Sequence, residues 1–238
     1  MSARIGIVKP GSTFPEMILR FGDYDAWFAR ALGGEVDCRV YETAGSDLPD
    51  PDDADGWIVT GARGSVARPE PDTVALFDWI REMAAHDAPL LGVCYGHQAI
   101  CEALGGRVER HPGGWEIGTT EVELTSAGRK DPLFAGLPER FRVQTTHEDY
   151  VALLPPDATL LAVNPHTEVQ AVALGPLVRG VQFHPEVTPE IAHDFVARRR
   201  HLLERDPEVA GSPHAGRILA NFVAAFVRPR GARHAGAD

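Results

Sequence analysis

The feature that most constrains the fold is the alternation of short apolar runs with longer amphipathic stretches in the first half of the chain. Residues 89–93 are almost entirely apolar and lead directly into a helical pattern. Such a run is typical of a strand at the centre of a parallel sheet, where both faces are covered. The same alternation predicts strands at 5–8, 36–41, 57–60 and 89–93, and helices at 15–32, 72–86 and 96–104.

The second half of the chain has a different pattern, with shorter polar–apolar alternation. It predicts strands at 119–124, 140–145, 160–163, 169–174 and 177–183, then helices at 189–205 and 213–227. We find no internal repeat and no linker between two domains. We therefore expect residues 1–228 to form one α/β domain, with a mostly parallel central sheet flanked by helices and a smaller antiparallel β portion. Residues 229–238 are expected to be a disordered tail.

Charge and composition narrow the classes of partner. The net charge of −11 argues against a nucleic-acid or anionic-membrane partner, since phosphate-binding surfaces need clustered Lys and Arg. The one dense basic run, residues 198–200, has acidic neighbours and is expected to be a solvated helix face. Three irregularly spaced cysteines suggest no disulfide framework. With no leader pattern and no apolar run of about 20 residues, we expect a cytoplasmic protein outside the membrane.

A cysteine lies where the predicted buried strand meets the following helix. Cys94 has Gly92 two residues before it and Gly96 two residues after it. This pattern is typical of a nucleophile elbow, a tight strained turn that exposes the nucleophile at a helix N-terminus, where thiolate is favoured. The alternative is an inert core cysteine, which is our reading of Cys101, but glycine has no packing reason to bracket such a residue. We therefore favour Cys94 as a nucleophile.

A thiolate nucleophile needs a base and a group that orients the base. His184 and Glu186 lie two residues apart at the end of a predicted strand, so their side chains project to the same side of an extended chain. Pro185 between them restricts the backbone to extended forms. His-Pro-Glu by itself is more often a surface turn. Together with the elbow 90 residues earlier, it predicts a triad of Cys94, His184 and Glu186.

Acyl chemistry also needs donors for a developing oxyanion. The backbone N–H groups near Gly61 and Ala62, after the strand at 57–60, and that of Tyr95 are the candidates, although a plain βα turn would look the same. His147 comes just after the strand predicted at 140–145 and could equally line a pocket or have a structural role. No group of His, Cys and Asp has zinc-like spacing, and a metal on Cys94 would block the nucleophile, so we expect no metal and no cofactor.

At residues 92–98, together with His184-Pro185-Glu186, the sequence resembles class I (triad) glutamine amidotransferases. The likeness covers nearly the whole chain and includes Ile-Val-Thr-Gly at 58–61 and Gly-Asp-Tyr at 22–24. It is strongest to stand-alone members similar to the amidotransferase domain of GMP synthase, with a secondary likeness to γ-glutamyl peptidases. The resemblance implies a flavodoxin-like α/β fold and glutamine hydrolysis through a γ-glutamyl thioester.

The resemblance also implies roles for individual residues. Cys94 is the nucleophile, His184 the base and Glu186 its orienting acid. Tyr95 and Ala62 furnish oxyanion N–H groups. The implied substrate-binding residues are Gln98, which helps hold the α-amino and α-carboxylate end of the substrate, together with His147, Glu148 and Asp149.

The sequence departs from the family pattern near the expected mouth of the site. Gly61-Ala62-Arg63 stands where many members have Gly-Gly, and His147-Glu148 stands where they often have His-Gly. Residues 115–118 resemble the peptidase branch. The family resemblance makes glutamine hydrolysis, with ammonia passed to a synthetase partner, the expected activity, and these departures keep a γ-glutamyl peptide hydrolase as the alternative. A non-catalytic subunit that retains the fold is a third reading. Without a nucleotide-activating motif, the chain is not expected to make GMP alone.

Overall fold

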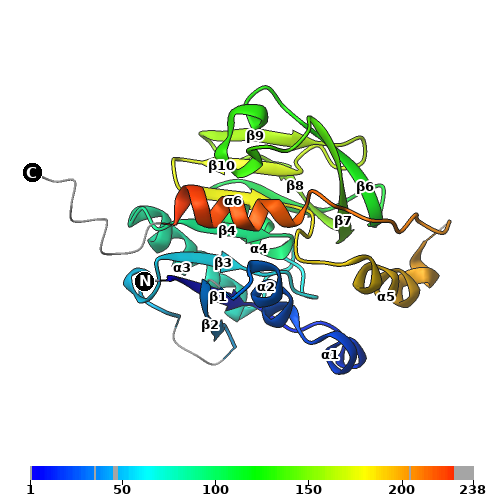
Figure 1. Cartoon of the computed structure of the whole chain (residues 1–238), viewed down its shortest axis with the longest axis horizontal. Helices are drawn as coiled ribbons and strands as arrows, with labels where there is room; N and C mark the ends of the chain where they lie inside the picture. Colours follow the sequence, from blue (N-terminus) through cyan, green and yellow to red (C-terminus); the bar gives the residue numbers. More distant parts are fainter. Residues whose placement is uncertain (1, 35, 45–47, 204, 228–238) are drawn as a thin grey trace, which may run out of the picture.

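The structure, a computed structural model, describes residues 2–34, 36–44, 48–203 and 205–227. In these ranges the apolar runs form one nine-stranded sheet (Figure 1). The strand order is β2-β1-β3-β4-β11-β10-β9-β6-β7. The parallel half comprises β2 (Val36–Glu42), β1 (Ala3–Lys9), β3 (Gly56–Val59), β4 (Leu90–Val93) and β11 (Val178–Val181). The antiparallel half comprises β10 (Ala171–Leu174), β9 (Ala158–Val163), β6 (Glu116–Leu124) and β7 (Arg140–His147).

Helices cover both faces of the parallel half. One face packs against α2 (Tyr24–Leu32) and α6 (Gly216–Phe226), and the other against α3 (Pro71–Ala85) and α4 (Tyr95–Ala103). Fully buried side chains such as Phe28, Phe222 and Leu76 contribute about 1.5–3 kcal/mol each. This arrangement confirms the expected α/β class with a mostly parallel central sheet, and β4 is buried along its whole length as its apolar sequence predicts.

The helix predicted at 15–32 is wrong, because the structure has two helices there. α1 (Pro15–Phe21) ends at Gly22, whose φ of 82° favours glycine. The side chain of Asp23 then accepts hydrogen bonds from the backbone N–H groups of Thr13 and Tyr24, which starts α2 in a new direction. The chain therefore turns at the Gly-Asp-Tyr sequence, and this turn brings Tyr24 to the carboxyl edge of the sheet.

The remaining differences from prediction are local. The helix predicted at 189–205 is shorter, with α5 (Pro189–Arg199) followed by a 3-10 turn, Arg200–Leu202. A separate ribbon of β5 (Arg107–Arg110) and β8 (Asp149–Leu153) was not predicted. Short 3-10 turns occur at Pro51–Asp53, Gly128–Lys130 and Pro132–Phe134. The tail predicted at 229–238 lies outside the described residues. No helix in the described ranges is long and apolar enough to cross a membrane.

Candidate active site

The sheet order brings the two halves of the predicted triad to one edge. β4 lies between β3 and β11, and Val93 at the end of β4 pairs with Val181 at the end of β11. The backbone N–H of Cys94 donates to the carbonyl of Val181 at 2.9 Å, and that of His184 donates to Gln144 at 2.8 Å. Because neighbouring parallel strands end at the same edge, the residues that follow them meet there.

Cys94 has the strained backbone of an elbow. Its φ of 53° and ψ of −101° are uncommon for a non-glycine residue, and α4 begins at the next residue. A Cβ on Gly92 would lie 2.4 Å from the carbonyl oxygen of Gly96, and one on Gly96 would lie 2.2 Å from that of Val59. The two flanking glycines are therefore required by close backbone packing, as the sequence predicts.

His184 and Glu186 form a buried pair. Nδ1 of His184 lies 2.7 Å from Oε1 of Glu186, and the two side chains are 1% and 0% exposed. Burial by itself lowers the pKa of His184, but the charges of Glu186 and Cys94 outweigh it and raise that pKa to about 10. Nε2 is buried with no hydrogen-bond partner among the described residues, so this nitrogen is available for proton transfer.

Tyr24 and Gly61 pack against the imidazole of His184. The Tyr24 ring stacks on it with ring centroids 6.4 Å apart and planes 16° apart. Burial, and next the charge of Cys94, raise the pKa of Tyr24 well above its ordinary value. A Cβ on Gly61 would lie 2.9 Å from Cε1 of His184 and 3.2 Å from the Tyr24 ring. Gly61 thus leaves room for the imidazole, and Tyr24 packs against His184, a contact that the sequence did not predict.

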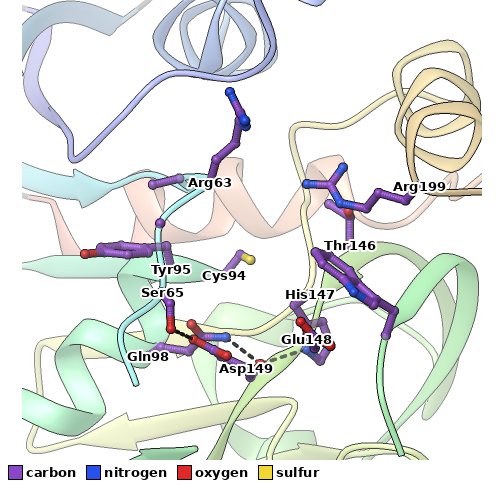
Figure 2. Close-up of a pocket in the computed structure, with 13 residues that line it drawn as sticks. Arg63, Ser65, Cys94, Tyr95, Gln98, Thr146, His147, Glu148, Asp149 and Arg199 are labelled. Atoms are coloured by element: carbon purple, nitrogen blue, oxygen red, sulfur yellow. Dashed lines mark hydrogen bonds between the residues drawn. The ribbon is translucent and has the colours of Figure 1, made fainter. Parts of the chain in front are cut away.

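A cavity of about 120 Å³ opens beside Cys94 (Figure 2). It is lined by Ala62, Arg63, Gly64, Ser65, Cys94, Tyr95, Gln98, Trp115, Thr146, His147, Glu148, Asp149 and Arg199. The structure therefore brings Ala62, Tyr95 and every predicted substrate-binding residue to one pocket with the cysteine. Gly61, His184 and Glu186 are not among the lining residues. In the described part of the chain, no three His, Cys, Asp or Glu side chains are grouped as a metal site.

Hydrogen bonds fix the polar end of this pocket. Nε2 of Gln98 donates to the backbone carbonyl of Asp149 at 2.7 Å and to Oε1 of Gln182 at 3.1 Å. The Asp149 carboxylate accepts a hydrogen bond from the Ser65 hydroxyl at 2.5 Å, which ties the loop after β3 to β8. Glu148 pairs with Arg110 at 2.5 Å.

His147 forms a hydrogen bond with a buried carboxylate, that of Glu116. Its Nε2 lies 2.8 Å from Glu116, and its Nδ1 lies 3.0 Å from the carbonyl of Asp149. Glu116 also accepts hydrogen bonds from Asn164 and Gln170. Burial raises the pKa of Glu116, but the hydrogen bonds from His147 and Asn164 and the charge of His147 outweigh this effect and lower that pKa. Sequence reasoning missed Glu116 because the β6–β7 register that places it opposite His147 is not visible in the sequence.

The expectation of a solvated basic face at 198–200 is wrong for its middle residue. Arg199 is only 8% exposed and lines the pocket. Thr188 caps α5 by accepting a hydrogen bond from the Ile191 N–H, and Pro189 starts the helix, whose last residue is Arg199. Its guanidinium lies 4.7 Å from the ring centroid of Trp115. Charge composition alone could not reveal this burial.

Known proteins match the chain in both sequence and fold. Residues 28–201 match the family Glutamine amidotransferase class-I, and the chain belongs to this family. It is 41% identical to the glutamine-hydrolysing GMP synthase of Aeropyrum pernix over 134 residues, 56% of this chain and 24% of that protein. The chain therefore spans about a quarter of that synthase.

A second relative is covered over most of its length. Gamma-glutamyl peptidase 5 of Arabidopsis thaliana is 28% identical over 194 residues, 78% of this chain and 77% of the peptidase. The crystal structure of a glutamine amidotransferase from Methylobacillus flagellatus superposes with a TM-score of 0.73 at 18% identity, covering 98% and 99% of the two chains. This last likeness concerns the fold alone.

Proposed function

We propose that this chain hydrolyses the side-chain amide of glutamine to glutamate and ammonia through a γ-glutamyl thioester on Cys94. The observation that carries the proposal is a strained cysteine at a helix N-terminus, which interacts with a buried His–Glu pair that follows the neighbouring strand β11. The membership of a glutamine amidotransferase family supports it. These are the three groups that nucleophilic acyl transfer by a thiol requires.

In the first half of the reaction, the Cys94 thiolate attacks the amide carbon and forms a C–S bond. The negative charge moves to the carbonyl oxygen, where the N–H groups of Ala62 or Gly61 and of Tyr95 are the proposed donors. The C–N bond then breaks, and His184 gives its proton to the departing nitrogen. Glu186 holds the imidazole in the orientation needed and stabilises its charged form.

In the second half, His184 takes a proton from water, whose oxygen attacks the thioester carbon. The C–S bond breaks, Cys94 returns as thiolate, and glutamate leaves. We place the α-amino group of the substrate near Glu148 and Asp149, since carboxylates attract an ammonium, with Gln98 and His147 as further contacts.

We further propose that a synthetase partner receives the ammonia. Support comes from the Aeropyrum relative, a GMP synthase of which the matched part is about a quarter. A cytoplasmic location fits a thiol that must stay reduced to act. A γ-glutamyl peptide hydrolase using the same triad is the second candidate, and the Arabidopsis relative favours it.

The test is release of ammonia and glutamate from glutamine by the purified protein. We expect Cys94→Ala to lower the rate at least about a thousandfold, as loss of a nucleophile does. Cys38→Ala, which changes a half-buried cysteine on β2, is the matched control and should keep the rate. Retained activity in Cys94→Ala would refute the proposal. No turnover, with Cys94 inert to a glutamine-like electrophile, would instead support a non-catalytic subunit.

A further inference from the structure

Two buried polar groups in the pocket lack a partner. Nη1 of Arg199 and the hydroxyl of Thr146 are buried without a hydrogen-bond partner in the part of the chain that the structure describes, and both residues line the cavity beside Cys94. Arg199 is 8% exposed and Thr146 is 9% exposed. Burying a charge without an anion is costly, and so is burying a hydroxyl without a partner. The pocket therefore presents a positive charge and a hydroxyl donor to a ligand that enters it.

The guanidinium of Arg199 is held in place by aromatic rings. It lies 4.7 Å from the ring centroid of Trp115, 5.1 Å from that of Phe14 and 5.2 Å from that of Phe195. Arg63 lies over the same Phe14 ring at 4.2 Å and adds a second positive charge. These rings leave Arg199 little freedom to turn toward solvent.

The neighbouring Arg198 has a different environment. It forms ion pairs with Asp194 at 2.5 Å and with Glu16 at 3.0 Å, and it does not line the pocket. No such carboxylate pairs with Arg199 in the described ranges. The contrast shows that acidic residues are available on this helix but do not neutralise the arginine that faces the cavity.

The two ends of the pocket carry opposite charges. Figure 2 shows Glu148 and Asp149 on one side of the Cys94 sulfur, and Arg63 and Arg199 on the other. The acidic end suits the α-ammonium of a γ-glutamyl group, and the α-carboxylate is attached to the same carbon. A glutamyl group placed this way leaves the basic end of the pocket empty.

The basic end lies on the side from which the leaving group departs. Tyr24 stacks on His184 and packs edge-on against Trp27, which in turn packs edge-on against Phe195. The Arg199 guanidinium lies over the Phe195 ring, so Arg199 and His184 border the same group of aromatic rings. In the proposed reaction the departing nitrogen takes its proton from His184, so a substituent on that nitrogen projects toward this side. Ammonia has no substituent to fill the space.

We propose that Arg199 and Thr146, assisted by the charge of Arg63, form a binding site for a carboxylate on the leaving amine. The preferred substrates are then γ-glutamyl amides of amino acids, whose C–N cleavage releases an amino acid in place of ammonia. A planar guanidinium matches a carboxylate with two parallel hydrogen bonds. This inference rests on the proposed thioester chemistry, and it ranks the second candidate function, γ-glutamyl peptide hydrolysis, above glutamine hydrolysis by the same triad.

The first experiment compares kcat/KM for γ-glutamylglycine, for γ-glutamylglycinamide, which has nearly the same size but lacks the carboxylate on the leaving amine, and for glutamine. We expect the acid to exceed the neutral amide at least about tenfold. Arg199→Met should lower the ratio of acid to amide by about 10- to 100-fold, the effect of losing a charged hydrogen bond, and Arg199→Lys by less. Thr146→Val should lower it a few-fold. Arg198→Met is the control and should leave the ratio unchanged.

Equal rates for acid and amide in the wild type would overturn the inference. An equal fall in kcat/KM for all three substrates in Arg199→Met would overturn it too. The charge of Arg199 would then affect the Cys94 thiolate or the stability of the fold, and not the binding of the leaving amine. Thermal unfolding of each variant shows whether it is folded.

A second measurement separates this inference from the proposed function. Cys94→Ala cannot form the thioester, so calorimetry can measure its equilibrium binding of the acid and of the amide. We expect tighter binding of γ-glutamylglycine and loss of that preference when Arg199→Met is added. Preferential binding of the acid by Cys94→Ala, together with no turnover of any substrate by the wild type, would refute the hydrolysis but support the binding site. Turnover without preferential binding would keep the hydrolysis and refute the site.

Discussion

The charge on Glu186 should stabilise the folded protein through His184, and the effect should depend on pH. Because the folded pKa of His184 is raised above its unfolded value, the stabilisation is fully present below about pH 6.5 and is lost as pH rises through the folded pKa. The rise from 6.5 to about 10 corresponds to about 5 kcal/mol, of which about 4 kcal/mol remains at pH 7. Glu186 shares this effect with Cys94.

In Glu186→Gln the side chain keeps its shape but loses its charge. We expect the free energy of unfolding to fall by about 2–4 kcal/mol at pH 7 and by less than about 1 kcal/mol at pH 10.5. Urea unfolding at the two pH values measures both. Glu82→Gln, an exposed site on α3, is the control and should change stability by less than about 0.5 kcal/mol.

The same variant should also be impaired in turnover. Without the carboxylate, the imidazole of His184 is neither oriented nor stabilised as a cation, so kcat should fall by about 10²- to 10⁴-fold. An equal loss of stability at both pH values would refute the electrostatic reasoning. So would a variant that is as stable and as active as the wild type.

Three further substitutions test the packing of the site. Gly96→Ala places a Cβ 2.2 Å from a backbone carbonyl and should cost about 3 kcal/mol or more by thermal unfolding, whereas Gly211→Ala, with nothing within 4 Å, should be nearly neutral. Gly61→Ala places a Cβ 2.9 Å from His184 and should lower kcat/KM about 10- to 100-fold while the protein stays folded. Glu116→Ala removes the acceptor of three buried donors and should cost about 2–4 kcal/mol in urea unfolding. Unchanged stability or activity in any of the three would contradict the contacts described.

Much of the parallel half of the fold could be predicted from the sequence. An all-apolar run such as β4 has few stable positions other than the middle of a covered sheet. The antiparallel strands were predicted one by one, but their joining to the same sheet depends on register, which their sequences do not fix. The break at Gly22 was missed because apolar residues continue at helical spacing across it. The short strand β5 is mostly exposed and carries little pattern.

In the candidate site too, residues placed by local structure could be predicted, and residues placed by tertiary packing could not. Cys94 and the His184–Glu186 pair could be found because each depends on a local turn or strand end. Glu116 and Arg199 could not, because each reaches the site through packing between elements distant in the chain. Arg199 in particular lies in a charge run that is typical of an exposed helix face, but in the structure it packs against the rings of Phe14, Trp115 and Phe195.

The most direct test of the central claim is the site of covalent labelling by a glutamine analogue with an electrophilic carbon in place of the amide. The chain has three cysteines, Cys38, Cys94 and Cys101. Peptide mass spectrometry should find the label on Cys94 alone, with loss of ammonia release in proportion to labelling and protection by glutamine. Labelling of Cys38 or Cys101 in its place, or full labelling of Cys94 with activity retained, would contradict the account.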